Sequence, residues 1–165
     1  MNVVASVQPY HCIDDGRWAT KKIGDDRARF AFPLKRFLDE GIPLAFGTDW
    51  PVAPLDPLKG IYAAVTRATT DGNNPNGWIP EQKIGVEEAL RAYTFGSAYA
   101  SHEDGDKGTL EQGKLADIVV LSENPFNVPP QELKDLKVVL TIVGGHIVYS
   151  DGTLFGKELH GNSST

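Results

Sequence analysis

Asp49 is the side chain in this sequence best placed to do chemistry, because it closely follows the short apolar run Ile42–Phe46, which is typical of a parallel strand. In α/β folds, catalytic and ligand-binding groups collect at the carboxyl ends of such strands. A carboxylate in that place can bind a metal ion or take a proton from a metal-bound water. An aspartate in a loop rich in glycine and proline also often caps a turn and does nothing else. The spacing alone leaves both interpretations of Asp49 open.

Two further side chains are candidates for binding a substrate. His11 follows another predicted strand end, in the segment Gln8–His11, where it would contact a substrate or a metal unless it is simply an exposed loop histidine. Arg67 ends a predicted helix and offers a guanidinium to an anionic group, although an arginine there ordinarily complements the helix dipole. Each of the two therefore has a binding interpretation and a structural one.

The other histidines, the other acids and the single cysteine form no known catalytic motif. The sequence contains no His-x-His pair, no paired cysteines, no Gly-x-Ser-x-Gly elbow and no nucleotide-binding fingerprint. Cys12 directly follows His11, but adjacent side chains do not face each other productively. Structural or surface roles are expected for Asp14, Asp15, His102, Asp117, His146 and His160.

The elements that must position these residues alternate between strands and helices over the first hundred residues. Their expected ranges are strands at 2–9 and 42–46, helices at 33–40, 57–68 and 86–101, and a polar loop at 10–26 with a short helix at 18–22. This alternation is typical of βα units in a parallel sheet. The apolar run Val3–Val7 predicts a strand buried on both faces, which needs neighbours on both sides. Two such units do not close a barrel, so we expect the chain to be the end of a longer protein.

The pattern becomes β-rich after residue 105. A strand is predicted at residues 118–121, and two more at 138–143 and 146–149. The link Gly144-Gly145 between the last two is a strong signal for a hairpin. This part of the chain therefore predicts a piece of a small sheet.

The bulk composition limits the class of protein and its partners. The chain has 165 residues, 41% of them hydrophobic, and a net charge of −6, which is the profile of a soluble globular protein. The negative charge argues against a nucleic-acid partner, since phosphate binding needs a basic face. No apolar stretch approaches the ~20 residues that span a bilayer, and the start of the chain does not resemble a signal peptide. We therefore expect no membrane partner and, by default, a cytoplasmic location.

Four segments, taken in order, resemble the amidohydrolase superfamily and, within it, the branch called amidohydrolase family 3. They are residues 6–19, beginning SVQPYH; residues 41–52, GIPLAFGTDWPV; residues 56–67; and residues 89–121, containing ALRAYT and KGTLEQGKLADIVVL. The ending GGHIVY at 144–149 fits as well. The last of the four segments is specific to the C-terminal region of the superfamily.

This resemblance implies an α/β fold in which a distorted (β/α)8 barrel stands beside a small β-sandwich. The chain would hold only the C-terminal portion of that fold. Residues 1–105 would form the last βα units of the barrel and the following helix, residues 106–155 the C-terminal strands of the sandwich, and residues 156–165 a polar tail.

The resemblance also implies a metal-dependent hydrolase that acts on carbon–nitrogen bonds other than peptide bonds, in small amide-like substrates. Asp49 would help hold the metal and accept a proton from the metal-bound water, His11 would line the substrate pocket, and Arg67 would lie behind the rim of that pocket. The family's other ligands come from strands that this chain lacks. A divalent metal, zinc in the full-length parent, is therefore not expected on this chain alone, which should be inactive by itself. The alternative is a non-catalytic module that associates with a partner chain, either the missing barrel half or a second copy.

Overall fold

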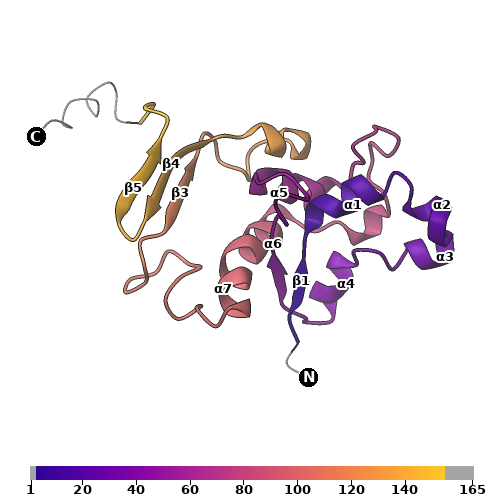
Figure 1. The fold of residues 1–165 in the computed structure, drawn as a ribbon, viewed down its shortest axis with the longest axis horizontal. Helices are drawn as coiled ribbons and strands as arrows, with labels where there is room; N and C mark the ends of the chain where they lie inside the picture. Colours follow the sequence, from indigo (N-terminus) through magenta and orange to yellow (C-terminus); the bar gives the residue numbers. More distant parts are fainter. Residues whose placement is uncertain (1–2, 155–165) are drawn as a thin grey trace, which may run out of the picture.

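The computed structural model describes residues 3–154, which form two separate small sheets with helices packed around the first (Figure 1). The first sheet has two parallel strands, β1 (Ala5–Val7) and β2 (Leu44–Phe46), and pairs Val7 with Phe46 at their carboxyl ends. The second is antiparallel, in the order β3 (Ile118–Leu121), β4 (Val138–Val143) and β5 (His146–Ser150). The chain is thus a mixed fold of helices and strands, as predicted. The predicted tail at 156–165, with His160, lies outside the described residues.

Strand β1 is shorter and more exposed than the sequence predicts. It covers three residues, and Val3 just before it is 57% exposed. Among the described residues its one strand neighbour is β2, which is buried at all three positions. The prediction of a strand buried on both faces is therefore wrong for β1 in this chain, since too little of the structure covers it.

The region predicted as a polar loop is largely helical, and that prediction was wrong. It contains α1 (Pro9–Asp15), α2 (Ala19–Ile23) and α3 (Asp25–Ala28), of which only α2 corresponds to the predicted short helix. Pro9 starts α1, and α1 then buries Cys12 and Ile13 and packs against helix α5 (Pro57–Thr66). Tertiary packing of this kind stabilises a helix too short to form alone.

The two helices around β2 agree closely with the prediction. They are α4 (Leu34–Asp39) and α5 (Pro57–Thr66). Asp56 caps α5, where its carboxylate accepts a hydrogen bond from the backbone N–H of Leu58 at 3.0 Å. The helices and β2 enclose the main core, whose buried members include Leu34, Phe46, Leu58, Ile61, Ala89 and Leu133.

The long helix predicted at 86–101 is interrupted by a π-helical turn. It divides into α6 (Val86–Arg91), the π-turn η2 (Ala92–Gly96) and α7 (Ser97–Ala100). The turn η2 and α7 both lie against β2. Two 3-10 turns, η1 (Pro80–Gln82) and η3 (Pro130–Asp135), complete the helical part, and η3 packs against α5.

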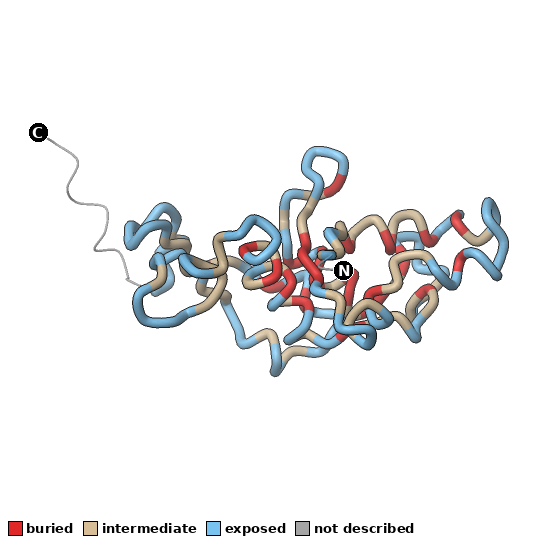
Figure 2. Tube along the Cα trace, turned by 90° about the horizontal axis from the view of Figure 1, so that it is seen from below, coloured by how far each residue is buried: buried red, intermediate tan, exposed pale blue. Residues whose placement is uncertain are grey.

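The predicted hairpin is confirmed. Gly144 and Gly145 link β4 and β5 with φ angles of 56° and 83°, as a type I′ turn requires. The Asp117 carboxylate accepts a hydrogen bond from Gly144 N at 2.7 Å, which gives this acid a turn role. Figure 2 shows that the buried segments gather in the middle of the molecule, while the hairpin end is mostly exposed.

Candidate functional site

The parallel pairing of β1 and β2 brings two predicted site residues together. His11 lies in the first turn of α1, just after β1, and Asp49 lies in the loop after β2. Because the strands run parallel, both residues are at the same edge of the sheet. His11 Nε2 is 3.1 Å from Asp49 Oδ2, although the residues are 38 positions apart in sequence.

The backbone at Asp49 adopts an uncommon conformation. Its φ is 61°, in the left-handed region that aspartate tolerates better than most residues. Its carbonyl accepts hydrogen bonds from Val52 N at 2.8 Å and Ala53 N at 3.2 Å, which closes a tight turn. The turn contains a cis peptide bond between Trp50 and Pro51, and Trp50 is exposed. Asp49 therefore has the turn role that its sequence allows, and its carboxylate is also directed toward His11.

The two carboxylate oxygens of Asp49 are in different surroundings. With its Nε2 protonated, His11 donates to Oδ2, and within the described residues Oδ1 has no hydrogen-bond partner. The Asp49 side chain is 52% exposed and that of His11 is 23% exposed. One oxygen is thus oriented by an imidazole while the other remains open to a water or another ligand.

A metal ion would find donors of suitable type here, but too few of them. Zinc binds imidazole nitrogen and carboxylate oxygen, and a catalytic zinc usually has three protein ligands. Within residues 3–154, no group of three or more His, Cys, Asp or Glu side chains could hold a metal ion. The residues present therefore do not make a metal site by themselves.

Arg67 is not part of this pair. It is fully buried, and its guanidinium donates to three backbone carbonyls, those of Trp78 at 2.7 Å, Phe32 at 2.9 Å and Ala31 at 3.3 Å. It also lies over the Trp78 ring, 5.7 Å from the ring centroid. This geometry does not fit the predicted contact with a substrate, because the Arg67 guanidinium is bound to the backbone of two segments, Ala31–Phe32 and Trp78.

The weaker candidates have the structural surroundings expected of them. Asp14 pairs with Arg17 at 2.6 Å on the surface of α1. His102 follows α7 in a left-handed conformation, and His146 is exposed at the start of β5. His102 and His146 lie on elements that are separate from α1 and from the Asp49 loop.

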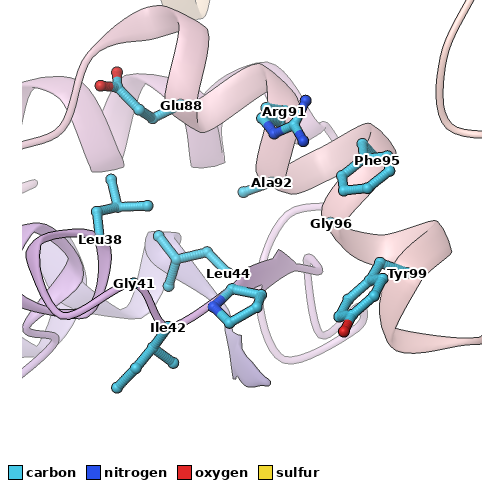
Figure 3. Close-up of a pocket in the computed structure, with 11 residues that line it drawn as sticks. Leu38, Gly41, Ile42, Leu44, Glu88, Arg91, Ala92, Phe95, Gly96 and Tyr99 are labelled. Carbon is cyan, nitrogen blue, oxygen red and sulfur yellow. The ribbon is translucent and has the colours of Figure 1, made fainter. Parts of the chain in front are cut away.

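A groove of about 310 Å³ lies at the opposite end of β2 (Figure 3). Leu38, Ile42 and Leu44 line one side of it, and Arg91, Phe95 and Tyr99 line the other. It opens at the amino end of β2, whereas Asp49 follows the carboxyl end. The groove is therefore separate from the candidate site.

Two residues at the site escape analysis of the sequence alone. Ser97 Oγ donates to the carbonyl of Phe46 at 2.8 Å, and Tyr93 Oη donates to that of Gly47 at 3.4 Å. Both carbonyls immediately precede the Asp49 turn. In the sequence, Tyr93 and Ser97 are two hydroxyl-bearing residues four positions apart on an otherwise apolar helix face, and this spacing was the one indication of their role.

Comparisons with known proteins show which family the chain belongs to. The model of the amidohydrolase family matches residues 1–149. A putative amidohydrolase of Bacillus subtilis, YtcJ, is 35% identical over 149 residues, which are 90% of this chain and 28% of the relative. The N-substituted formamide deformylase of Arthrobacter pascens is 33% identical over 118 residues, 72% of this chain and 21% of the relative.

Solved structures give the same result. An uncharacterized metal-dependent hydrolase from Pyrococcus horikoshii OT3 superposes with a TM-score of 0.68 at 32% identity, over 78% of this chain and 26% of that one. The chain belongs to the amidohydrolase family. It spans about a quarter of the length of the relatives it matches. Within the described residues, no helix has the length and apolar character needed to cross a bilayer.

Proposed function

We propose that this chain is the C-terminal piece of a metal-dependent amidohydrolase that cleaves carbon–nitrogen bonds other than peptide bonds, and that Asp49 is its catalytic base. The observation that carries the proposal is the contact between His11 and Asp49 at the carboxyl edge of two parallel strands. In a (β/α)8 barrel this edge is the active-site face. The barrel, its sandwich, the domain limits at residues 105 and 155 and a cytoplasmic location remain predictions from the sequence.

The chemistry assigned to Asp49 follows from its two oxygens. His11 holds Oδ2, so Oδ1 is free to take a proton from a water that attacks the carbonyl carbon of an amide. The same carboxyl group then returns that proton to the leaving nitrogen as the carbon–nitrogen bond breaks. His11 acts here by orienting the carboxylate, and its exposed ring edge can also contact the substrate.

The divalent metal of the proposal, zinc, would need ligands from outside this chain. Asp49 supplies one carboxylate, and the described residues offer no complete group of ligands. We therefore propose that the chain alone binds no metal stoichiometrically and hydrolyses no amide. Dialysis of the purified chain against zinc, followed by elemental analysis and an amine-release assay, tests this. Stoichiometric zinc accompanied by turnover would contradict it.

The catalytic assignment needs the missing strands and is tested in a chimera. The 118 residues that match the Arthrobacter pascens deformylase would replace the corresponding region of that enzyme, and release of amine from an N-substituted formamide would be measured. Asp49→Asn should lower kcat at least ~100-fold, the usual contribution of a general base. Asp56→Asn is the matched control, since asparagine also caps a helix and the acid lies seven positions away in the same loop. An Asp49→Asn chimera as active as the parent chimera would refute the assignment.

A second candidate function is a non-catalytic module that associates with a partner chain. The observation that favours it is the exposed apolar surface of the β3–β5 sheet, which includes Val119, Val148 and Tyr149. Apolar strand surfaces of this kind promote association. The two candidates differ in the chimera, because a module without chemistry would tolerate Asp49→Asn.

A further inference from the structure

The carboxyl end of β2 is held from the side opposite β1. Ala5 N donates to the carbonyl of Pro43, and Gly47 N donates to that of Val7. The backbone hydrogen-bonding groups of the odd-numbered residues between 43 and 47 therefore point toward β1. Alternation along a strand then directs the carbonyls of Leu44 and Phe46 to the other edge. That edge is covered by η2 and α7 instead of a strand.

Ser97 takes the place of a strand donor at this edge. Its hydroxyl lies 2.8 Å from the carbonyl oxygen of Phe46 and 3.0 Å from that of Ala92 in its own helix. The single hydroxyl proton can serve one acceptor fully, and the shorter distance favours Phe46. The last carbonyl of β2 is thereby satisfied from the helix.

Tyr93 contacts the next carbonyl along the chain. Its hydroxyl donates to Gly47 at 3.4 Å, and its ring meets the Phe46 ring edge-on at a centroid distance of 5.4 Å. Burial raises the pKa of the Tyr93 phenol, with a further contribution from the Asp56 carboxylate, so the hydroxyl keeps its proton and remains a donor.

Two glycines make this approach sterically possible. A Cβ on Gly96 would collide with the carbonyl oxygen of Leu44, and a Cβ on Gly60 in α5 would collide with the hydroxyl of Tyr93. The collision at Leu44 could not be relieved cheaply, because its partner is a backbone atom. The close packing of η2 against β2 and α5 therefore depends on glycine at positions 96 and 60.

We propose that Tyr93 and Ser97 are positioning residues for Asp49, holding the two carbonyls that precede its turn and so keeping the carboxylate against His11. The inference rests on the proposed function, because a fixed carboxylate matters only if Asp49 acts on a substrate. An unfavourable φ such as that of Asp49 persists only where the surroundings hold it. The hydroxyls of Tyr93 and Ser97 are the side-chain donors, within the described residues, to the backbone of Phe46 and Gly47.

The test is amide hydrogen exchange by NMR on the whole 165-residue chain. The amides of Val52 and Ala53 report on the turn, because both donate to the carbonyl of Asp49. In the double variant Tyr93→Phe/Ser97→Ala their exchange should accelerate roughly tenfold, as expected from the loss of two hydrogen bonds. Each single variant should give a smaller acceleration, which keeps the test open if the double variant does not fold.

Matched controls lie in α7 and at its C-cap. Tyr99→Phe and Ser101→Ala remove a phenol and a hydroxyl that make no hydrogen bond to β2 within the described residues, and both should leave the exchange of Val52 and Ala53 unchanged. The β4–β5 hairpin amides should keep their rates in every variant. Unchanged exchange at Val52 and Ala53 would overturn the inference, and so would an equal acceleration of all protected amides, which indicates general destabilisation. The readout involves neither metal nor substrate, so its failure is distinct from a failure of the Asp49→Asn chimera.

Discussion

The sequence allowed a functional and a structural interpretation for both Asp49 and Arg67, and the structure places the two side chains in different surroundings. Asp49 combines a turn conformation with a carboxylate that is half exposed and oriented by His11. Arg67 is fully buried, and all its described hydrogen bonds go to backbone carbonyls. The cost of burying a guanidinium is offset only where its donors are satisfied. Arg67 is therefore a structural cation, whereas the Asp49 carboxylate remains accessible.

Arg67→Lys should destabilise the chain by about 2–4 kcal/mol, because a lysine cannot present the planar fork that reaches Trp78, Phe32 and Ala31. Urea unfolding followed by circular dichroism measures the change. Arg27→Lys on exposed α3 is the control and should stay within about 0.5 kcal/mol. Equal stabilities of the two variants would show that the Arg67 hydrogen bonds contribute little.

Cys12 gives a pH prediction at the same scale. Burial, only partly offset by the Arg67 guanidinium, raises the pKa of the Cys12 thiol from 9.0 to about 11. Above pH 9 the unfolded chain loses this proton and the folded chain keeps it, so stability should fall between about pH 9 and pH 11. The slope contributed by Cys12 is at most about 1.4 kcal/mol per pH unit.

The measurement compares urea unfolding of the native chain and of Cys12→Ala across this pH range. Cys12→Ala removes the titrating group, so its stability should decline less steeply above pH 9. Parallel curves for the two proteins would mean that the thiol ionises equally in the folded and unfolded chains.

At the scale of elements, the π-turn η2 determines how closely the last long helix approaches β2. The sequence predicts an uninterrupted helix at 86–101, and residues from Val86 to Tyr93 do pack on the core. The sequence pattern does not predict the hydrogen-bond acceptors of Tyr93 and Ser97, since both hydroxyls donate to carbonyls more than forty positions away. Because the Tyr93 hydroxyl lies close to Gly60, a substitution at Gly60 tests the position of the Tyr93 ring.

Gly60→Ala in α5 should destabilise the chain by about 1–2 kcal/mol. In an ordinary helix the same change stabilises by about 1 kcal/mol, but here the new methyl group meets the Tyr93 hydroxyl. The free energies of unfolding of Gly60→Ala, Tyr93→Leu and the double variant give the interaction energy between the two positions. The destabilisation caused by Gly60→Ala should be smaller when Tyr93 is replaced by leucine. A stabilised Gly60→Ala variant would show that Tyr93 is not seated as the structure has it.

At the scale of the whole molecule, the two sheets differ in how well they are covered. Helices enclose β2, whereas the β3–β5 sheet carries Val119, Thr141 and Tyr149 as neighbours on one face, with Val119 55% and Tyr149 49% exposed. A small sheet with a solvated apolar face is marginally stable alone and tends to associate. This asymmetry agrees with a chain that spans about a quarter of its relatives.

We expect the isolated chain to associate at micromolar concentration, with a sedimentation mass above its 17.9 kDa monomer. Val119→Lys/Tyr149→Lys should shift it toward the monomer, because charges on a strand surface oppose pairing. Val52→Lys, at an exposed apolar position in the Asp49 loop, is the control and should not. A monomeric native chain would argue against self-association through this sheet.

The sequence by itself indicated the family, through the resemblance of its segments, and singled out Asp49 as a candidate. It also predicted helices α4 and α5 and the Gly144-Gly145 hairpin. The predictions of these elements depend on local features, namely the period of apolar residues, caps and turn residues, which fix the backbone over short distances. Helix α1 escaped detection because its stability comes from packing on α5.

Only the tertiary structure decided which side chains meet. The contact of His11 with Asp49 depends on the parallel register of β1 and β2, and the burial of Arg67 depends on loops 11 to 36 positions away. The bond from Ser97 to Phe46 joins residues 51 positions apart. No local period encodes such distances, because they follow from how whole elements pack. Asp49 was therefore a candidate from sequence alone, and the packing of α1, β2 and η2 is what gives it an oriented carboxylate.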